Sequence, residues 1–331
     1  MAVFTQVSDT DLHAFLGKYS PDIGDFIKLE GISGGIENTN YFLHTTNAVY
    51  VLTIFERLAL EQLPFYLDLM ANLASNGICV PNPIKDNKGN ILNILCGKPA
   101  TIVTKLAGSS ILEPNQSNLS ELGLEVAKMH MVSKVSSNKN NININTLSLN
   151  QPNLRGLDWW NETIPTILPF VTPDIKQKLE SELEFQNIFY NSEIYKKLPQ
   201  GACHCDLFCD NALFNENKLS GIFDFYFAGF DTFLFDICVI INDWCIYRDR
   251  SNPSFGKINL DLYNSFMQSY QSIRAFTPAE TDAIPSMLRA AALRFWVSRL
   301  WDWYLPRDSQ LLKPHDPTHF ELILSKRVNN N

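Results

Sequence analysis

The chain has 331 residues, of which 45% are hydrophobic and 19% are charged. This composition indicates a folded globular protein of about two domains, and it excludes a disordered, collagen-like or coiled-coil chain. The 35 acidic residues outnumber the 27 basic residues, which gives a net charge of −8. Such a balance argues against a protein that binds nucleic acid by neutralising its phosphates.

The cysteines and the apolar segments indicate a cellular compartment. The seven cysteines are an odd number, and several lie in apolar stretches, so no disulfide framework is expected. The N-terminus does not resemble a signal peptide, and no apolar run approaches the ~20 residues that span a bilayer. We therefore expect a cytoplasmic protein without a membrane partner.

The first predicted elements are a helix and a block of strands. Ser8, followed by acidic residues, predicts the start of a helix that buries Leu12 and Phe15. The segment 27–55 is rich in β-branched and aromatic residues, and Thr46-Asn47-Ala48 within it predicts a hairpin. A glycine-containing segment, Gly31-Ile-Ser-Gly-Gly35, precedes the first strand of this hairpin.

Helical patterns dominate the rest of the chain. Apolar residues at helical spacing predict a helix over 61–76, which Gly77 ends, and a pair of strands is expected around 84–105. From Leu119 onward the patterns are helical. The sequence therefore predicts an α+β protein with a β-rich part at 1–105 and a mostly helical part at 106–331.

The segment most informative about chemistry is His204-Cys-Asp-Leu-Phe-Cys-Asp-Asn211, followed by a short apolar strand that ends at Asp224. Phosphoryl transfer needs a few oxygen ligands for magnesium and a separate carboxylate for the attacking hydroxyl. Asn211 and Asp224 suit the metal, and Asp206 suits the hydroxyl. Taken singly, each could be a turn or capping residue, but the ordered set H-x-D-x-x-x-x-N, then Asp-Phe, is typical of kinases.

Zinc binding is an alternative interpretation of the same segment, because it also contains Cys203, His204, Cys205 and Cys209. A structural zinc site usually has two well-separated pairs of ligands, and the second pair is missing here. Packed small cysteines are therefore the better interpretation.

Taken together, these motifs resemble the aminoglycoside-phosphotransferase-like kinases and, within them, the homoserine kinase family. The resemblance covers nearly the whole chain, and the catalytic segment 204–211 is specific only to the superfamily. Narrower segments carry the family resemblance: Asp224-Phe-Tyr-Phe-Ala228, Asn242-Asp-Trp-Cys245 and Leu293-Arg-Phe295.

The resemblance implies a two-lobed protein-kinase-like fold, with a nucleotide-binding lobe at 1–105, a catalytic and substrate lobe at 106–331, and ATP in the cleft between them. It also implies roles for single residues. Asp206 matches the catalytic aspartate, and Asn211 and Asp224 match the Mg²⁺ ligands. The segment Ser33-Gly34-Gly35-Ile-Glu-Asn38 matches the turn that covers the nucleotide, where glycine lets backbone N–H groups approach phosphates.

The chain departs from this family pattern at Thr53. Most relatives carry a lysine at this position of the strand, where it pairs with the nucleotide phosphates. The homoserine kinase branch tolerates the change, so an active enzyme is still expected. Arg57 and Lys105 are the nearest alternative cations in the sequence, with Glu61 as a candidate partner, although either cation is more often a solvated surface residue.

The implied activity is ATP-dependent phosphorylation of L-homoserine, a small-molecule substrate, on the route to threonine. A zwitterionic substrate needs a basic partner for its carboxylate and an acidic partner for its ammonium. Candidates for this pocket are Tyr226, Asp243, Arg294 and Arg299. Three alternatives remain: another small alcohol such as an aminoglycoside or choline, a nucleotide-binding scaffold without turnover, and, for the arginines, an amphipathic helix that buries Trp296, Leu300 and Trp303 and pairs Arg299 with Asp302.

Overall fold

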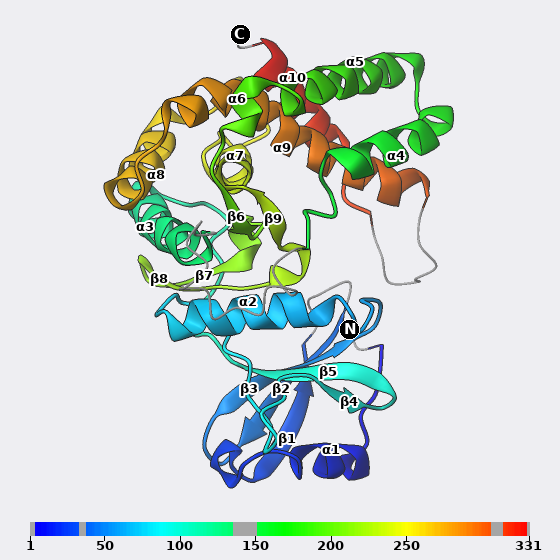
Figure 1. Ribbon diagram of the computed structural model, residues 1–331, viewed down its shortest axis with the longest axis vertical. Helices are drawn as coiled ribbons and strands as arrows, with labels where there is room; N and C mark the ends of the chain where they lie inside the picture. The colour runs from blue at the N-terminus through cyan, green and yellow to red at the C-terminus, as the bar shows by residue number, and fades with distance from the viewer. Residues whose placement is uncertain (1–3, 33–37, 135–150, 306–313, 330–331) are drawn as a thin grey trace. The chain divides into compact units, whose positions relative to one another are not determined.

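The computed structural model describes residues 4–32, 38–134, 151–305 and 314–329, which form two compact units (Figure 1). Unit 1 comprises residues 1–107, and unit 2 comprises residues 108–331. No helix in these described ranges has both the length and the apolar character needed to cross a bilayer.

Unit 1 is built on an antiparallel sheet of five strands in the order β1-β2-β3-β5-β4. The strands are β1 (Phe26–Gly31), β2 (Asn38–Thr45), β3 (Val49–Phe55), β4 (Asn93–Leu95) and β5 (Lys98–Thr104). The predicted hairpin is confirmed as β2 and β3, which pair from His44 and Val49 outward. Gly31, the first residue of the glycine-containing segment, is the last residue of β1, a strand that the sequence pattern alone did not distinguish within its block.

Two helices accompany this sheet, and Figure 1 shows them on opposite sides of it. Helix α1 (Asp9–Leu16) begins as predicted at Ser8, whose hydroxyl accepts a hydrogen bond from the Asp11 backbone N–H. Leu12 and Phe15 of α1 pack against one face of the sheet in the core of unit 1. Helix α2 (Leu63–Ser75) is followed by Gly77, whose φ of +80° is a conformation that favours glycine.

Unit 2 is mostly helical and contains two small antiparallel strand pairs. Its helices are α3 (Gln116–Ser133), α4 (Leu157–Ile167), α5 (Pro173–Tyr190), α6 (Glu193–Lys196), α7 (Phe233–Trp244), α8 (Leu260–Ile273), α9 (Pro278–Tyr304) and α10 (Thr318–Asn329). Strand β6 (Gln200–Cys203) pairs with β9 (Gly229–Thr232), and β7 (Ala212–Asn215) pairs with β8 (Lys218–Ile222). The strand pairs matter for function because the segment 204–211 lies between β6 and β7.

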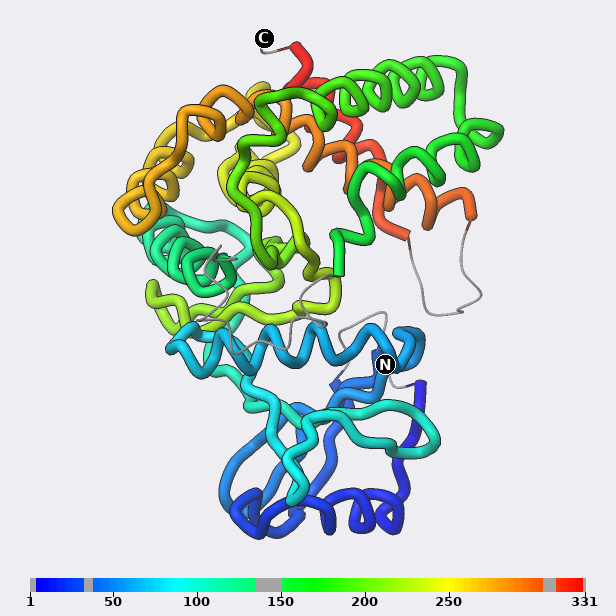
Figure 2. The backbone as a smooth tube through the Cα atoms, in the orientation of Figure 1, coloured from blue at the N-terminus to red at the C-terminus, as the bar shows by residue number. Residues whose placement is uncertain are grey.

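Helix α7 is the centre of unit 2, and the other helices surround it in Figure 2. All twelve of its residues are buried, including Asp236, Asn242 and Asp243. Acidic residues are rarely buried unless they are paired or hydrogen-bonded. The buried carboxylates of the central helix are therefore expected to hydrogen-bond polar groups of neighbouring segments.

The amphipathic helix proposed around Arg294 and Arg299 is the C-terminal part of α9, and its details differ from the pattern-based expectation. Trp296 and Leu300 are buried as predicted, but Trp303 is 49% exposed. Arg299 donates a hydrogen bond to the backbone carbonyl of Asp316. The prediction for Trp303 was wrong because it comes at the last turn of α9, where the helix leaves the core.

Candidate active site

The candidate catalytic residue Asp206 lies in a loop held by helix α7. The carboxylate of Asp236 accepts hydrogen bonds from two successive backbone N–H groups, those of His204 at 2.7 Å and Cys205 at 2.6 Å. Cys205 has a left-handed backbone with φ of +62°. For a residue with a side chain, this conformation costs about 1–3 kcal/mol and persists only where its surroundings enforce it. Asp236 thus stabilises a strained turn directly before Asp206.

His204 acts as a buried support of the same loop. Its Nδ1 accepts a hydrogen bond from the Asp206 backbone N–H at 3.3 Å, and its Nε2 donates to the Phe223 carbonyl at 2.8 Å. Burial lowers the pKa of His204, which agrees with a neutral ring that carries its single proton on Nε2. His204 therefore joins the Asp206 loop to the segment that leads into Asp224.

The next turn of the loop brings Asn211 to Asp206. The Asn211 side-chain amide donates to the Asp206 backbone carbonyl at 2.7 Å and contacts Asp206 Oδ2 at 3.4 Å. Because Nδ2 makes both contacts, the amide oxygen Oδ1 is left for another donor or a cation. This orientation fits the predicted role of Asn211 as a ligand of a hard metal ion.

Asp224, the other predicted metal ligand, follows β8 by two residues and begins a short 3₁₀ turn, Phe225–Phe227. Its backbone is also left-handed, with φ of +64°, and the residue is exposed. A non-glycine residue with a left-handed backbone is uncommon, and such strained residues cluster at functional sites. A carboxylate oxygen and an amide oxygen form a donor set that suits magnesium.

Arg294 contacts the candidate catalytic carboxylate directly. Its Nη2 lies 3.2 Å from Asp206 Oδ1, and its Nη1 donates to the Ser298 hydroxyl at 3.3 Å. The guanidinium carbon is 4.0 Å from the ring centroid of Phe295 and 5.3 Å from that of Phe227. With 5% of the Arg294 side chain exposed and 16% of Asp206, this is a largely desolvated ion pair between α9 and the catalytic loop.

The other candidate substrate residues are Asp243, Tyr226 and Arg299, of which Asp243 and Arg299 lie close enough to interact electrostatically. Asp243 accepts a hydrogen bond from the Cys209 backbone N–H at 2.9 Å and forms an ion pair with Arg248, also at 2.9 Å. Tyr226 is half-buried on the 3₁₀ turn after Asp224. Arg299 stacks on Phe320 of α10, 4.6 Å from the ring centroid.

Thr53 in unit 1 is 2% exposed, and its hydroxyl donates to Asn40 Oδ1 at 2.7 Å. Alternate residues of a strand share one face, and Thr53 pairs with Asn40 and Thr101. Lys105 lies on this face, with its ammonium 5.3 Å from the ring centroid of Phe42. Lys98 instead forms an ion pair with Glu56. Ile54 pairs with Ala100, and Lys98 and Glu56 lie two positions from these residues, so this ion pair is on the opposite face of the sheet.

The remaining predicted nucleotide residues are only partly described. Ser33, Gly34 and Gly35 lie outside the described residues. Asn38 is the first residue of β2, and its Oδ1 is buried without a hydrogen-bond partner among the residues that the structure describes. A buried acceptor of this kind is costly to leave unpaired, so Asn38 fits a position that receives a donor from a ligand or a neighbouring segment. Arg57 and Glu61 are both exposed.

The zinc interpretation finds no support in the geometry. All seven cysteines are free, and Cys203, Cys205 and Cys209 are buried. Among the described residues, the ligand cluster that includes Cys203 is formed with His130 and Asp236, not with His204, Cys205 and Cys209. The Asp236 carboxylate is already occupied by backbone N–H groups and by His130. These cysteines therefore belong to the packed core.

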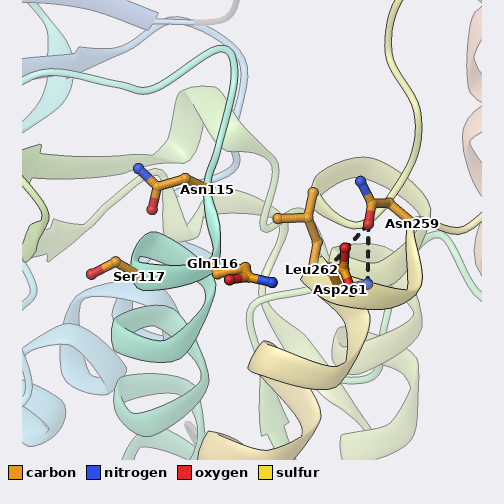
Figure 3. A pocket seen from close by; sticks show the side chains of 6 residues that line it. All are labelled: Asn115, Gln116, Ser117, Asn259, Asp261 and Leu262. Atoms are coloured by element: carbon orange, nitrogen blue, oxygen red, sulfur yellow. Dashed lines mark hydrogen bonds between the residues drawn. The ribbon is translucent and has the colours of Figure 1, made fainter.

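Figure 3 shows a separate pocket of unit 2, at the N-terminal ends of α3 and α8. It is lined by Asn115, Gln116, Ser117, Asn259, Asp261 and Leu262. Asn115 and Asn259 already cap their helices, each accepting a backbone N–H at 3.1 Å. None of the lining residues belongs to the Asp206 loop, so this pocket is not part of the candidate active site.

Acid sensitivity of unit 2 is expected from His319. Burial, with the nearby Arg299, lowers the pKa of His319 from 6.5 to about 4. The stability that neutral His319 supports is therefore complete above pH 6.5 and is lost as the pH falls toward 4, by up to about 3 kcal/mol. His319→Gln should give a smaller loss of unfolding free energy between pH 7 and pH 4.5 in urea titrations. An identical pH slope in both proteins would contradict this role.

Several residues that hold this loop were given no role by the sequence motifs, although Trp244 lies in the family segment Asn242-Asp-Trp-Cys245. Asp236, Trp244 and Arg248 each hold the loop, Trp244 by donating from its indole N–H to the Leu207 carbonyl at 3.0 Å. One signal was available in the sequence: Asp236 lies inside the apolar run Phe233–Ile241, and a carboxylate buried in such a helix needs partners. For Arg248 we find no comparable sequence signal.

Comparison of the whole chain with known proteins gives its family. Residues 28–276 match the phosphotransferase enzyme family. The chain is 47% identical over 328 residues to a homoserine kinase of Polaromonas naphthalenivorans (strain CJ2), with 99% of this chain and 98% of that protein aligned. It is 49% identical over 338 residues to a homoserine kinase of Ralstonia pickettii (strain 12J), with 99% and 96% aligned.

Solved structures agree on the fold. An amicoumacin kinase in complex with AMP-PNP and Ca²⁺ has a TM-score of 0.70 at 17% identity, covering 97% of this chain and 92% of that one. A spectinomycin phosphotransferase in complex with ADP and spectinomycin has a TM-score of 0.66 at 13% identity, covering 98% of both chains. The predicted kinase-like α+β fold is confirmed. The chain therefore belongs to the phosphotransferase enzyme family and, within it, to the homoserine kinases.

Proposed function

We propose that this chain transfers the γ-phosphoryl group of ATP to the hydroxyl of L-homoserine and forms O-phospho-L-homoserine, a step toward threonine. The identity of about 47% to curated homoserine kinases over nearly the full length supports the reaction. The observation that carries the choice of substrate in this chain is the position of Arg294 beside Asp206. A carboxylate and a guanidinium side by side match a small molecule that has both a hydroxyl and a carboxylate.

In this proposal Asp206 orients the substrate hydroxyl and accepts its proton as the phosphoryl group is transferred in line. The oxygen of the hydroxyl forms the new bond to phosphorus, and the bond from the γ-phosphorus to ADP breaks. Asn211 and Asp224 are the residues proposed to hold Mg²⁺, which neutralises charge on the phosphates when it is bound. The nucleotide itself is assigned to Ser33, Gly34, Gly35, Asn38 and Thr53, together with Asn211 and Asp224.

Arg294 is proposed to bind the carboxylate of homoserine, because a guanidinium can engage both carboxylate oxygens. Its aromatic neighbours leave a confined, weakly hydrated setting in which such a pair is favourable. Tyr226, Asp243 and Arg299 are the further residues assigned to this pocket. L-serine has one carbon fewer between its carboxylate and its hydroxyl, so its hydroxyl falls short of Asp206 when the carboxylate is bound.

The test is an ADP-release assay with ATP and a panel of hydroxyl compounds, supplemented by mass-spectrometric identification of the product. We expect turnover with L-homoserine, little with L-serine and none with kanamycin or choline. Efficient phosphorylation of an aminoglycoside would show that this chain acts on a different class of substrate. Binding of ATP, seen as a thermal shift, without phosphorylation of any compound would show a nucleotide-binding scaffold instead.

A further inference from the structure

A row of polar residues crosses the sheet of unit 1 on the face that carries Thr53. Asn40 of β2 pairs with Thr53 of β3, and Thr53 pairs with Thr101 of β5. The next row on this face consists of three apolar residues in register, Phe42, Val51 and Val103. Thr53 is 2% exposed, and Thr101 is fully buried. Polar groups in such a setting are costly unless each has a hydrogen-bond partner.

The two threonine hydroxyls find their partners within unit 1. Thr101 donates to the Ile91 carbonyl at 2.7 Å, and Thr53 donates to Asn40 Oδ1, also at 2.7 Å. The reverse orientation of the Asn40 amide would present Nδ2 to Thr53 and would leave the buried hydroxyl proton without this acceptor. Thr53 therefore fixes the orientation of the amide, with Oδ1 toward the threonine and Nδ2 away from it.

The Asn40 amide nitrogen is a donor that this row does not use. Asn40 is half-buried, and no hydrogen bond of its Nδ2 is found among the described residues. Asn38 lies two residues earlier on the same face of β2, and its Oδ1 is the buried unpaired acceptor noted above. Residues two positions apart on a strand are separated by about 7 Å. This end of the face therefore offers a neutral donor and a neutral acceptor to a ligand.

The charges near these asparagines favour an anionic ligand. Lys105 lies on the same face, with its ammonium over the Phe42 ring. Glu30 of the edge strand β1 is in register with Phe42, but it is paired with Lys28 at 2.7 Å. The opposite face of the sheet is filled by apolar side chains that pack against α1. A ligand at Asn40 thus meets an amide donor on a face that also carries an ammonium group, a combination that suits a phosphate.

We propose that Asn40 binds a phosphate oxygen of the nucleotide through Nδ2, and that Thr53 is a positioning residue that orients the Asn40 amide. This inference rests on the proposed use of ATP. An ionised phosphate oxygen only accepts hydrogen bonds, and the single proton of the Thr53 hydroxyl already goes to Asn40. An oriented neutral amide thus supplies a donor beside the position at which this chain has threonine in place of lysine.

The experiment is isothermal titration calorimetry of the full-length protein with MgATP and with adenosine, in the absence of homoserine. Asn40→Leu removes the amide but keeps the branching of the side chain, and Asn40→Asp replaces the donor with a charged acceptor. Thr53→Val removes the hydroxyl that orients Asn40, whereas Thr53→Ser keeps it. Thr101→Val is the matched control, because it is the same substitution in the same row and removes a hydroxyl that bonds a backbone carbonyl.

For Asn40→Leu we expect the Kd for MgATP to rise ~10-fold or more, which corresponds to one hydrogen bond to a charged group, while the Kd for adenosine stays within about twofold. Asn40→Asp should weaken MgATP binding further, because a carboxylate repels a phosphate; it carries the comparison if Asn40→Leu does not fold. Thr53→Val should raise the Kd for MgATP ~3–10-fold, because the amide keeps its place but loses its orientation. Thr53→Ser should recover most of this loss. Thr101→Val should lower the Tm without changing either Kd.

Three results would overturn the proposal. Equal weakening of MgATP and adenosine in Asn40→Leu would show that Asn40 supports the site without contacting a phosphate. An Asn40→Asp protein with an unchanged Kd for MgATP would exclude the contact. Equal effects of Thr53→Val and Thr101→Val would remove the positioning role of Thr53. A wild type that binds MgATP but does not phosphorylate homoserine would contradict the proposed substrate alone, because these binding measurements do not depend on turnover.

Discussion

Asp206→Asn is expected to lower kcat for homoserine phosphorylation by ~10²–10⁴-fold while ATP binding and folding are retained. The amide cannot accept the hydroxyl proton, yet it is nearly the same size as the carboxylate. The backbone of the loop is held independently of this side chain, by Asp236 and His204. One consequence is specific to this chain: Arg294 loses the charge of its partner, so the variant should be modestly less stable.

The measurement is steady-state kinetics with a titration of ATP binding, and Asp210→Asn is the matched control. Asp210 is an exposed carboxylate in the same loop, four residues further along the chain. Its replacement should leave kcat within about threefold of the wild type. If Asp206→Asn retains more than about a tenth of the wild-type kcat, Asp206 is not the proton acceptor.

Arg294→Lys is expected to raise the KM for homoserine at least tenfold and to lower kcat, while the KM for ATP changes less than threefold. Lysine keeps the charge but loses the planar fork that can engage a carboxylate and Asp206 together. A hydrogen bond to a charged group contributes about 1.5–3 kcal/mol, so the loss of one arm of the fork should lower kcat/KM for homoserine ~10-fold or more. The fall in kcat is expected because Arg294 contacts Asp206 itself.

Arg289→Lys provides a control on the same helix. Arg289 is also buried and also binds a carboxylate, that of Glu182, through Nε and Nη2. Its replacement should lower the Tm to a similar extent without a selective change in the KM for homoserine. An equal increase of both KM values in Arg294→Lys would show that Arg294 does not bind the substrate carboxylate.

Much of unit 1 follows from local sequence. The hairpin of β2 and β3 has β-branched residues on either side of a three-residue turn, and α1 begins where Ser8 can cap it. These features depend on residues within a few positions of one another, so a local pattern is enough to predict them. The same holds for the spacing of Asp206 and Asn211, which lie in one loop and share a hydrogen bond.

What the sequence did not reveal are contacts between residues far apart in the chain. Arg294 reaches Asp206 across 88 positions, Asp236 reaches the His204 amide across 32, and His130 reaches Asp236 across 106. Local propensity carries no information about such pairs, because an arginine in an amphipathic helix has the same pattern whether it pairs at the surface or with a buried carboxylate.

The sequence by itself therefore determined the family and the kinase-like α+β fold, and it located the candidate catalytic motif. Tertiary structure alone decided which side chains hold that motif in its strained conformation. Thr53 is an example of both kinds of information. Its place in a strand was predicted from the sequence, but only the pairing of the strands showed that Lys105 lies on the same face of the sheet as Thr53 and that Lys98 lies on the other face. The physical reason is that motifs are local in the chain, whereas burial and pairing of charges depend on packing between distant segments.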